Sequence, residues 1–203
     1  MVGPLQGIRI IDLTSTLMGP FATQSLGDLG AEIIKIEPPH GDVLRQVGPS
    51  KNAGMGALFL NNKRSKKSVQ IDLKTEAGRE LLLKLCKTAD VLIYNMRPQA
   101  MQRLNLGYEV LQSINPRLVY VGVHGFGEKG PYADRPAYDD LIQAGCGLAH
   151  LFSYRSQDGS PAYVPNAIAD RVGGLVAVNA ILAALIERGT SNLGQKIQIP
   201  MFE

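Results

Sequence analysis

Residues 8–36 read IRIIDLTSTLMGPFATQSLGDLGAEIIKI and carry clear strand and helix patterns. Residues 8–13 form a short β-branched, apolar run that predicts a strand. Gly19-Pro20 then predicts a helix, because proline at an early helical position loses no hydrogen bond, and that helix ends near Leu29 at Gly30. Residues 31–36 predict a second strand. The stretch is therefore predicted to be a βαβ unit.

The same alternation of strand and helix patterns continues along the chain. Further strands are predicted at residues 68–73, 91–94, 117–123 and 195–200, and helices at 75–87, 138–151 and 170–188. Such alternation is typical of an α/β fold with an open parallel sheet and flanking helices. The 203 residues are enough for one large α/β domain with a buried core.

Composition excludes several classes of function. Lys and Arg number 21 against 18 Asp and Glu, and a net charge of +3 is too small to indicate a nucleic-acid surface, so no nucleic-acid partner is expected. The basic stretch Lys63-Arg64-Ser65-Lys66-Lys67 is interpreted as a solvated charge run, with contacts to phosphates as the alternative. Cys86 and Cys146 lie in apolar helical patterns, which predicts small core residues in a reducing compartment and no disulfide.

Targeting and membrane signals are weak. The first five residues lack the basic and apolar regions of a signal peptide. The longest apolar run, residues 172–186, is shorter than the roughly 20 residues that span a bilayer. We therefore expect a soluble cytoplasmic protein with no membrane partner.

A glycine-rich motif follows the strand predicted at residues 117–123. Gly125-Phe126-Gly127-Glu128-Lys129-Gly130 matches G-x-G-x-x-G, which binds dinucleotide phosphates where a helix opens behind it. Pro131 comes next and no helix is predicted there, so a flexible loop near a site is favoured. A non-catalytic nucleotide-binding α/β domain stays open as the alternative from another class. The three histidines share no metal-ligand spacing, and no metal site is expected.

Asp170 is the leading candidate for a functional residue. It is a lone acid between a polar loop at residues 163–169 and the apolar helical run that ends at Arg188. At a helix start it is expected to stay ionised, either as a capping acid or as a carboxylate nucleophile. Loops at residues 14–18, 95–97 and 125–130 all follow predicted strands. In open parallel sheets, ligands bind outside those carboxyl ends.

Ordered motifs along the whole chain resemble a known family. They are Pro4-Leu5-Gln6-Gly7-Ile8-Arg9-Ile10-Ile11-Asp12, Gly19-Pro20, Leu29-Gly30-Ala31-Glu32-Ile33-Ile34-Lys35-Ile36-Glu37, Lys66-Lys67-Ser68-Val69-Gln70-Ile71-Asp72-Leu73-Lys74, Asn95-Met96-Arg97-Pro98, Arg103-Leu104-Asn105-Leu106-Gly107, Gly130-Pro131-Tyr132, Ala169-Asp170 and Gly194-Gln195-Lys196-Ile197. Together they resemble the N-terminal half of a class III CoA-transferase, the family of formyl-CoA transferase, the carnitine CoA-transferases and α-methylacyl-CoA racemase.

The resemblance implies a domain organisation. Residues 1–203 would be the N-terminal portion of the Rossmann-like, CoA-binding large domain of that family, without the small domain and the C-terminal return segment. We therefore expect a piece of a longer chain that is inactive alone. The full-length protein is expected to form an interlaced homodimer.

The resemblance also implies a reaction. Asp170 matches the family's nucleophile, which exchanges CoA between an acyl-CoA and a carboxylic acid acceptor through an aspartyl-CoA intermediate, with no tightly bound cofactor. Tyr138 and Asp139 match a tyrosine–acid pair at the active site. Racemases of the family carry a histidine where Tyr138 stands. Tyrosine, with a reference pKa of about 10, is a poor base near neutral pH. A transferase is therefore favoured, with the racemase as the alternative.

CoA-binding positions carry over residue by residue. Leu17 and Met18 match the loop along the CoA and the reacting centre, and a glutamine in place of Leu17 marks formyl-CoA transferase. The other matches are Ile71, Asp72, Leu73 and Lys74 near the adenosine and its phosphate, Asn95, Met96 and Arg97 at the pantetheine, and Arg103 at a phosphate.

Overall fold

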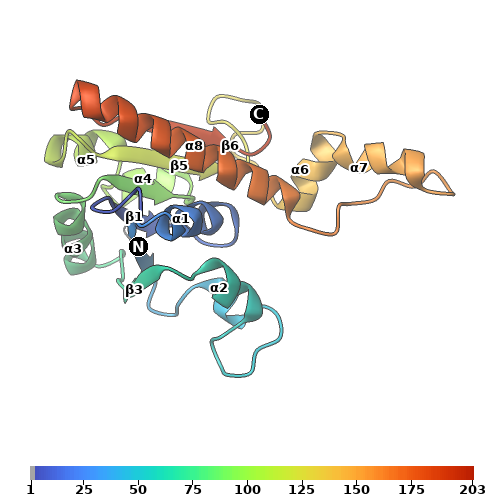
Figure 1. The fold of residues 1–203 in the computed structure, drawn as a ribbon, viewed down its shortest axis with the longest axis horizontal. Coiled ribbons are helices and arrows are strands. Elements are labelled where there is room, and N and C mark those ends of the chain that lie inside the picture. Colours follow the sequence, from blue (N-terminus) through green and yellow to red (C-terminus); the bar gives the residue numbers. More distant parts are fainter. Residues whose placement is uncertain (1–2) are drawn as a thin grey trace.

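A computed structural model describes residues 3–203, which form one open sheet flanked by helices (Figure 1). The described strands are β1 (Arg9–Leu13), β2 (Glu32–Glu37), β3 (Lys66–Gln70), β4 (Val91–Tyr94), β5 (Val119–His124) and β6 (Lys196–Pro200). The helices are α1 (Met18–Asp28), η1 (Val43–Gln46), α2 (Ala57–Asn62), α3 (Glu76–Cys86), α4 (Pro98–Arg103), α5 (Tyr108–Ile114), α6 (Asp139–Gly145), α7 (Leu148–Leu151), η2 (Phe152–Arg155) and α8 (Ile168–Ser191). All strand pairs are parallel, in the order β3-β2-β1-β4-β5-β6, which confirms the predicted fold.

The first βαβ unit occupies the centre of the sheet. Ile10 of β1 pairs with Ile33 of β2 and, on the other side, with Val91 of β4. The chain order therefore reverses at β1, since β2 lies on one side of it and β4 on the other. A crevice forms at such a switch point, beyond the carboxyl ends of the strands. The site described below lies there.

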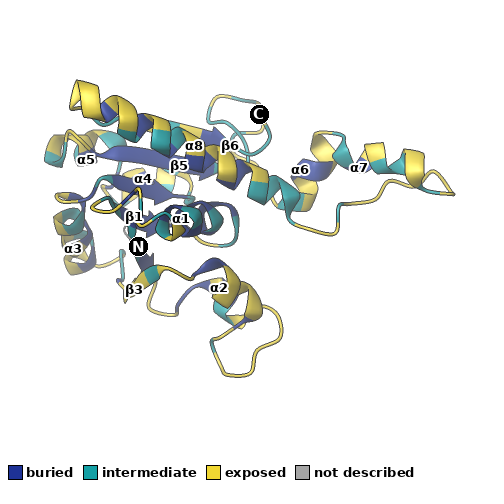
Figure 2. Ribbon diagram, in the orientation of Figure 1, coloured by how far each residue is buried: buried dark blue, intermediate teal, exposed yellow. Residues whose placement is uncertain are grey.

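Two apolar cores cover the two faces of the sheet (Figure 2). On one face, α1 and α8 bury Leu26 and Ile181 against β1, β4 and β5. On the other face, α3, α4 and α5 bury Leu82, Met101 and Leu111. Each such fully buried side chain stabilises the fold by roughly 1.5–3 kcal/mol. The inner strands β1, β4 and β5 are buried on both sides, which explains their near-continuous apolar sequences.

Helices α1 and α8 approach each other closely at Gly173 and Gly174. A Cβ atom at Gly173 would lie 2.7 Å from Met18 Cε, and one at Gly174 would lie 2.9 Å from the backbone oxygen of Met18. A side chain at Gly174 would meet backbone, and one at Gly173 would displace the end of the Met18 side chain. Glycine at these two positions therefore sets the distance between the helices.

One predicted element is displaced in the structure and another is divided. The strand predicted at residues 68–73 begins two residues earlier, since Lys66 of β3 already pairs with Ile33 at the edge of the sheet. It ends before Asp72, because the backbone oxygen of Asp72 accepts the N–H of Thr75 in a turn. The single helix predicted at residues 138–151 is two helices, α6 and α7. The break lies at Gly147, whose φ of 81° is left-handed.

One predicted core residue is also wrong. Cys86 is buried in α3, as expected, but Cys146 is exposed. It follows α6, which together with α7 extends away from the sheet (Figure 1). Both cysteines are free, as expected.

Helix α8 is longer than its apolar run suggested. Its 24 residues are long and apolar enough to cross a membrane, judged by length and composition alone. No other helix within residues 3–203 meets these two criteria. In the structure it packs on α1 and on the sheet, where Ala177, Ile181 and Ala184 are buried. Core helices of soluble proteins often share these properties.

Candidate active site

Asp170 lies in the first turn of α8, not at its cap. The helix begins at Ile168, two residues earlier than predicted, and its N-cap Ala167 offers no side-chain oxygen. The orphan N–H groups of the first turn therefore need acceptors from elsewhere. Asp139 Oδ1 accepts the backbone N–H of Asp170 at 2.9 Å. The capping carboxylate of α8 thus comes from α6.

The Asp170 carboxylate is held by a second helix. Its Oδ1 accepts a hydrogen bond from the backbone N–H of Met18, the first residue of α1, at 3.1 Å. The amino ends of α1 and α8 therefore converge on one carboxylate. Helix amino ends carry partial positive charge and favour an anion there.

The pKa of Asp170 nevertheless lies well above its ordinary value of 3.8. Burial and then the negative charge of Asp139 raise the pKa of Asp170 to about 6, against the opposing effects of the Met18 N–H and Arg171. The sequence-based expectation that a helix start keeps this acid ionised therefore holds only above that pH. A carboxylate that titrates just below neutrality is ionised at pH 7 yet more basic than an ordinary one, which suits a nucleophile.

The predicted Tyr138–Asp139 pair lies beside Asp170. Tyr138 precedes α6, is 68% exposed, and lines the same cavity as Asp170. Sequence reasoning missed Gln143, whose Nε2 donates to Asp139 Oδ2 at 2.7 Å. The signal was available, because residues four apart share one face of a helix.

A cavity of about 280 Å³ opens in front of Asp170. We call it the Asp170 cavity. Its walls come from the loops after β1, β4 and β5, with Met18, Arg97, His124 and Arg135 among the lining side chains. The three loops predicted to gather at the carboxyl edge of the sheet therefore do so.

A groove of about 490 Å³ lies on the other side of the β1–α1 loop, lined by residues between Leu13 and Leu104. We call it the β1–β4 groove. Seven predicted CoA-binding residues line it: Ile71, Asp72, Leu73, Lys74, Asn95, Met96 and Arg103. The other three do not. Met18 and Arg97 line the Asp170 cavity, and Leu17 lines a cleft between α6 and α8.

Asn95 joins the two spaces, since it lines both. Its Oδ1 accepts the backbone N–H of Ser15, and its Nδ2 donates to the backbone oxygen of Ser15, each at 3.0 Å. The next residue, Thr16, has a left-handed φ of 61°. The paired hydrogen bonds clamp the β1–α1 loop to the end of β4 and place the start of α1.

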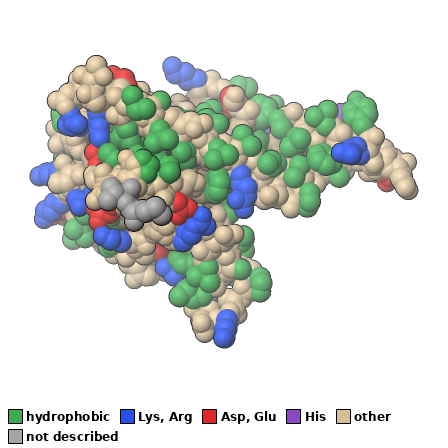
Figure 3. Space-filling view, in the orientation of Figure 1, with side chains coloured by type: hydrophobic (Ala, Val, Ile, Leu, Met, Phe, Trp, Pro, Cys, Tyr) green, Lys and Arg blue, Asp and Glu red, His purple; other side chains and the backbone are tan. Residues whose placement is uncertain are grey.

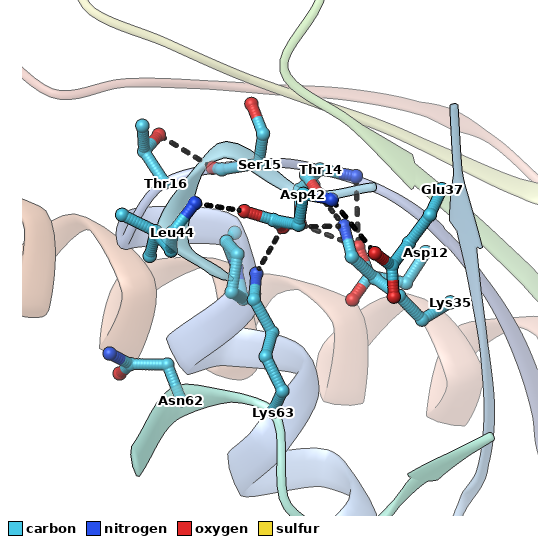
Figure 4. Close-up of polar contacts among 12 residues, drawn as sticks. Asp12, Thr14, Ser15, Thr16, Lys35, Glu37, Asp42, Leu44, Asn62 and Lys63 are labelled. Atoms are coloured by element: carbon cyan, nitrogen blue, oxygen red, sulfur yellow. Dashed lines mark hydrogen bonds and ion pairs between the residues drawn. The ribbon is translucent and has the colours of Figure 1, made fainter. Parts of the chain in front are cut away.

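A cluster of buried charges lies beneath this loop (Figure 4). Asp42 Oδ2 forms ion pairs with Lys35 Nζ at 3.3 Å and with Lys63 Nζ at 2.9 Å. Lys35 also donates to the backbone oxygen of Thr14. Burial lowers the pKa of Lys63 to about 8. The cluster ties the β1–α1 loop to β2 and to the segment before β3.

Asp12 forms the second half of the cluster. It accepts hydrogen bonds from Thr14, from Thr23 and from Lys66 Nζ, the last at 3.0 Å. Burial alone would raise the pKa of Asp12, but Lys66, Lys35 and Lys63 hold it well below its usual range. The basic stretch at residues 63–67 is therefore not a solvated run, because two of its lysines are buried against carboxylates.

The glycine-rich loop at residues 125–130 opens no helix. The next helix, α6, begins at Asp139, and the N–H of Gly127 donates to Glu203 Oε2 at 3.0 Å. The dinucleotide fingerprint therefore lacks the helix that it requires, as predicted. Within residues 3–203, His, Cys, Asp and Glu side chains form no group of three or more that could hold a metal ion.

Known proteins share this sequence and fold. The family model of CoA-transferase family III matches residues 5–203. The chain is 42% identical to acetyl-CoA:oxalate CoA-transferase of Acetobacter aceti, covering 99% of this chain and 51% of that protein. It is 39% identical to mouse (Mus musculus) succinyl-CoA:glutarate CoA-transferase, covering 94% and 44%. A crystal structure of a CAIB/BAIF family protein from Brucella suis superposes with a TM-score of 0.95 at 40% identity, covering 100% and 54%.

The chain thus spans about half the length of the curated relatives it matches. The match nevertheless runs through nearly all of residues 5–203 and includes the whole sheet. The chain therefore belongs to CoA-transferase family III.

Proposed function

We propose that the complete protein transfers CoA from an acyl-CoA thioester to a carboxylic acid, with Asp170 as the nucleophile. The observation that carries the proposal is the Asp170 carboxylate, held by the first N–H of α1 in front of a cavity. The family assignment and the relatives that act on acyl-CoA and carboxylates support it.

The proposed reaction has four steps, and each forms a covalent bond to an acyl carbonyl while it breaks another. The Asp170 carboxylate attacks the thioester carbonyl and CoA leaves as the thiolate, giving a mixed anhydride. The thiolate attacks the aspartyl carbonyl and expels the donor acid, which leaves an aspartyl-CoA thioester. The acceptor carboxylate attacks that thioester and releases the thiolate. The thiolate then attacks the acceptor's acyl carbonyl, so the new acyl-CoA departs and Asp170 is regenerated. Covalent catalysis thus divides one difficult exchange into easier steps.

The β1–β4 groove would bind the CoA. Lys74 and Arg103 bring exposed cations to its wall, where charge-assisted hydrogen bonds to phosphates form. Asn95, which also lines the Asp170 cavity, and Met96 would contact the pantetheine. Tyr138 and Asp139 flank the reacting carboxylate.

We further propose that the acids exchanged are small. The Asp170 cavity, at about 280 Å³, lies below the usual range of roughly 300–1,000 Å³ for drug-sized ligands. Arg97 and Arg135 at its wall suit a second carboxylate of the acceptor. Relatives named for oxalate and glutarate transfer are in line with a dicarboxylic acid.

The racemase alternative requires a base for α-proton exchange. His124 lines the Asp170 cavity, and burial lowers its pKa, so it would be neutral near pH 7. Tyr138, where family racemases carry a histidine, favours the transferase. Deuterium from solvent should appear at the α-carbon of an acyl-CoA if the racemase reading is correct, and should not appear if the transferase reading is.

The exposed apolar surface fits an assembly larger than this chain. Hydrophobic side chains on α6, α7 and the solvent side of α8 face outward (Figure 3). They include Leu141, Leu151, Val172, Leu175 and Val176. We propose that they are covered in an interlaced homodimer of the complete protein, acting in the cytoplasm.

Mass spectrometry tests the nucleophile. The full-length protein is incubated with a panel of acyl-CoA donors and trapped with hydroxylamine, which converts an aspartyl thioester to a hydroxamate. We expect the modification at Asp170 and its loss in Asp170→Asn. Asp158→Asn, which changes an acid of an exposed turn, serves as the control and should label normally. Modification of another residue, or of none with any donor, would contradict the assignment.

A further inference from the structure

Gln143 is a buried glutamine whose amide is fully engaged. It is 2% exposed and lies on α6, one turn after Asp139. Its Nε2 donates to Asp139 Oδ2 at 2.7 Å and to the backbone oxygen of Asn166 at 3.3 Å. Its Oε1 accepts the backbone N–H of Val164 at 2.9 Å. A buried amide with every partner in place is held in one orientation.

The fixed amide of Gln143 also fixes the orientation of the Asp139 carboxylate. One oxygen of the Asp139 carboxylate is taken by Gln143, which leaves the other, Oδ1, to accept the N–H of Asp170. A carboxylate bonded at both oxygens has little freedom to rotate. The contacts therefore run without a gap from Gln143 through Asp139 to the backbone of Asp170.

Gln143 also fastens the segment that leads into α8. Val164 and Asn166 both precede the first residue of the helix, and both bond to the same amide. If Gln143 served only to hold this segment, that is, only as a fastener, its side chain would need an oxygen to accept the Val164 N–H. It would not need an N–H group that donates to Asp139. Oε1 therefore serves the segment before α8 alone, whereas Nε2 serves both the segment, through Asn166, and Asp139.

We propose that Gln143 is a positioning residue for the reaction: it orients Asp139, and through it the nucleophile Asp170, and so governs the rate of acyl transfer and not the binding of CoA. The inference rests on the proposed function of Asp170. Gln143 is separated from CoA recognition, since it lines the cleft between α6 and α8 and not the β1–β4 groove.

Two single variants separate the roles. Gln143→Glu keeps an acceptor for the Val164 N–H but turns a carboxylate oxygen toward Asp139. Gln143→Met keeps the length of the side chain and removes all three hydrogen bonds of the amide. We expect each to lower kcat by about 10- to 100-fold with the KM for acyl-CoA within about twofold, since displaced reacting groups cost rate more than binding. Gln143→Glu also loses the hydrogen bond to the Asn166 oxygen, so a fastener alone would lower kcat in this variant without any recovery when the contact with position 139 is restored.

A double variant supplies the rescue. In Asp139→Asn/Gln143→Glu the polarity of the pair is reversed, so that the amide introduced at position 139 donates to the carboxylate introduced at position 143, while the amide oxygen still accepts the Asp170 N–H. Total charge is unchanged. We expect kcat of the double variant to exceed that of Gln143→Glu alone by about threefold or more, a coupling typical of directly bonded residues. Gln24→Met, which alters another buried glutamine on α1, is the control and should keep wild-type kcat.

The measurements are steady-state kcat and KM on the full-length protein, the hydroxylamine-trapped yield at Asp170, and circular dichroism of each variant to verify folding. Wild-type kcat in Gln143→Glu, or a double variant no faster than that single variant, overturns the role of Gln143. In either case, normal trapping at Asp170 leaves the proposed function standing. Absence of trapping in the wild type overturns both.

Discussion

The backbone N–H of Met18 donates to Asp170 Oδ1 at 3.1 Å, a contact between residues 152 positions apart. Met18 is the first residue of α1 and Asp170 lies in the first turn of α8. The position of the proposed nucleophile therefore depends on how these two helices pack.

Gly174→Ala should disturb that packing. The new Cβ would lie 2.8 Å from Phe21 Cδ1 and 2.9 Å from the Met18 oxygen, so the helices must separate and the Met18–Asp170 bond must lengthen. We expect kcat to fall about tenfold or more, since small misplacements of reacting groups are costly. Gly189→Ala on the same helix is the control, because nothing lies within 4 Å of its Cβ. It should keep its activity and gain roughly 0.5–1 kcal/mol in the free energy of unfolding, measured by denaturant titration. Equal activity in the two variants would contradict the packing argument.

The acid limb of the pH–rate profile should report Asp170. Because its pKa is raised to about 6 and only the carboxylate attacks, kcat/KM should fall about tenfold per pH unit below that value. Asp139→Asn removes a negative charge that raises the pKa, so the midpoint should move to lower pH. Protonation of Asp170 favours the folded state, since the folded pKa exceeds the ordinary 3.8, and its contribution to stability should rise as pH falls from about 6 toward 4. A midpoint that stays in place, or rises, in Asp139→Asn would argue against this coupling.

Lys66→Met should be strongly destabilising. It leaves the Asp12 carboxylate buried without its nearest cation, and breaking a buried pair in this way costs about 3–5 kcal/mol. The melting temperature should fall by roughly 10 °C for a chain of this size. The neighbouring Lys67 pairs with Glu32 but is 73% exposed, so Lys67→Met should change stability by less than about 1 kcal/mol. Differential scanning calorimetry compares the two, and similar melting temperatures would show that the buried cluster does not stabilise the fold.

Arg103→Met should weaken CoA binding without slowing chemistry. Its exposed guanidinium lines the β1–β4 groove, and loss of a charge-assisted contact to a phosphate should raise the Kd of CoA about tenfold or more. Arg117→Met, outside the groove, is the matched control. Isothermal titration calorimetry measures both Kd values. An unchanged Kd in Arg103→Met would remove this residue from the CoA site.

Elements with local signals could be predicted, and those that depend on distant partners could not. Residues 91–94 match β4 residue for residue because all four are buried and apolar. The edge strand β3 was misplaced because its side chains are largely exposed and carry no apolar pattern. No neighbour of Lys66 in the sequence predicts that this side chain is buried, because its carboxylate partner, Asp12, lies 54 positions away.

The candidate site also combines residues that sequence patterns predict with contacts that they do not predict. Asp170 could be chosen from a motif, whereas its acceptor and donor, Asp139 and Met18, belong to other helices. Gln143 carries a helical spacing signal from Asp139, but its contact with Val164 depends on the course of the chain between α7 and α8. Sequence thus indicates which side chains have suitable chemistry, and packing decides which of them meet.

The connection between β5 and β6 has a consequence for how such enzymes diversify. The β1–β4 groove is lined by residues between Leu13 and Leu104, whereas Asp139, Gln143 and Asp170 all lie on the single crossover that joins these two neighbouring strands. Its ends are fixed by the pairing of Val121 with Ile197. The proposed nucleophile and the two residues that position it are therefore encoded in one stretch of sequence, apart from the lining of the groove. Recombination of this one crossover between relatives would exchange the surroundings of the nucleophile while Met18, Arg97 and the groove stay as inherited.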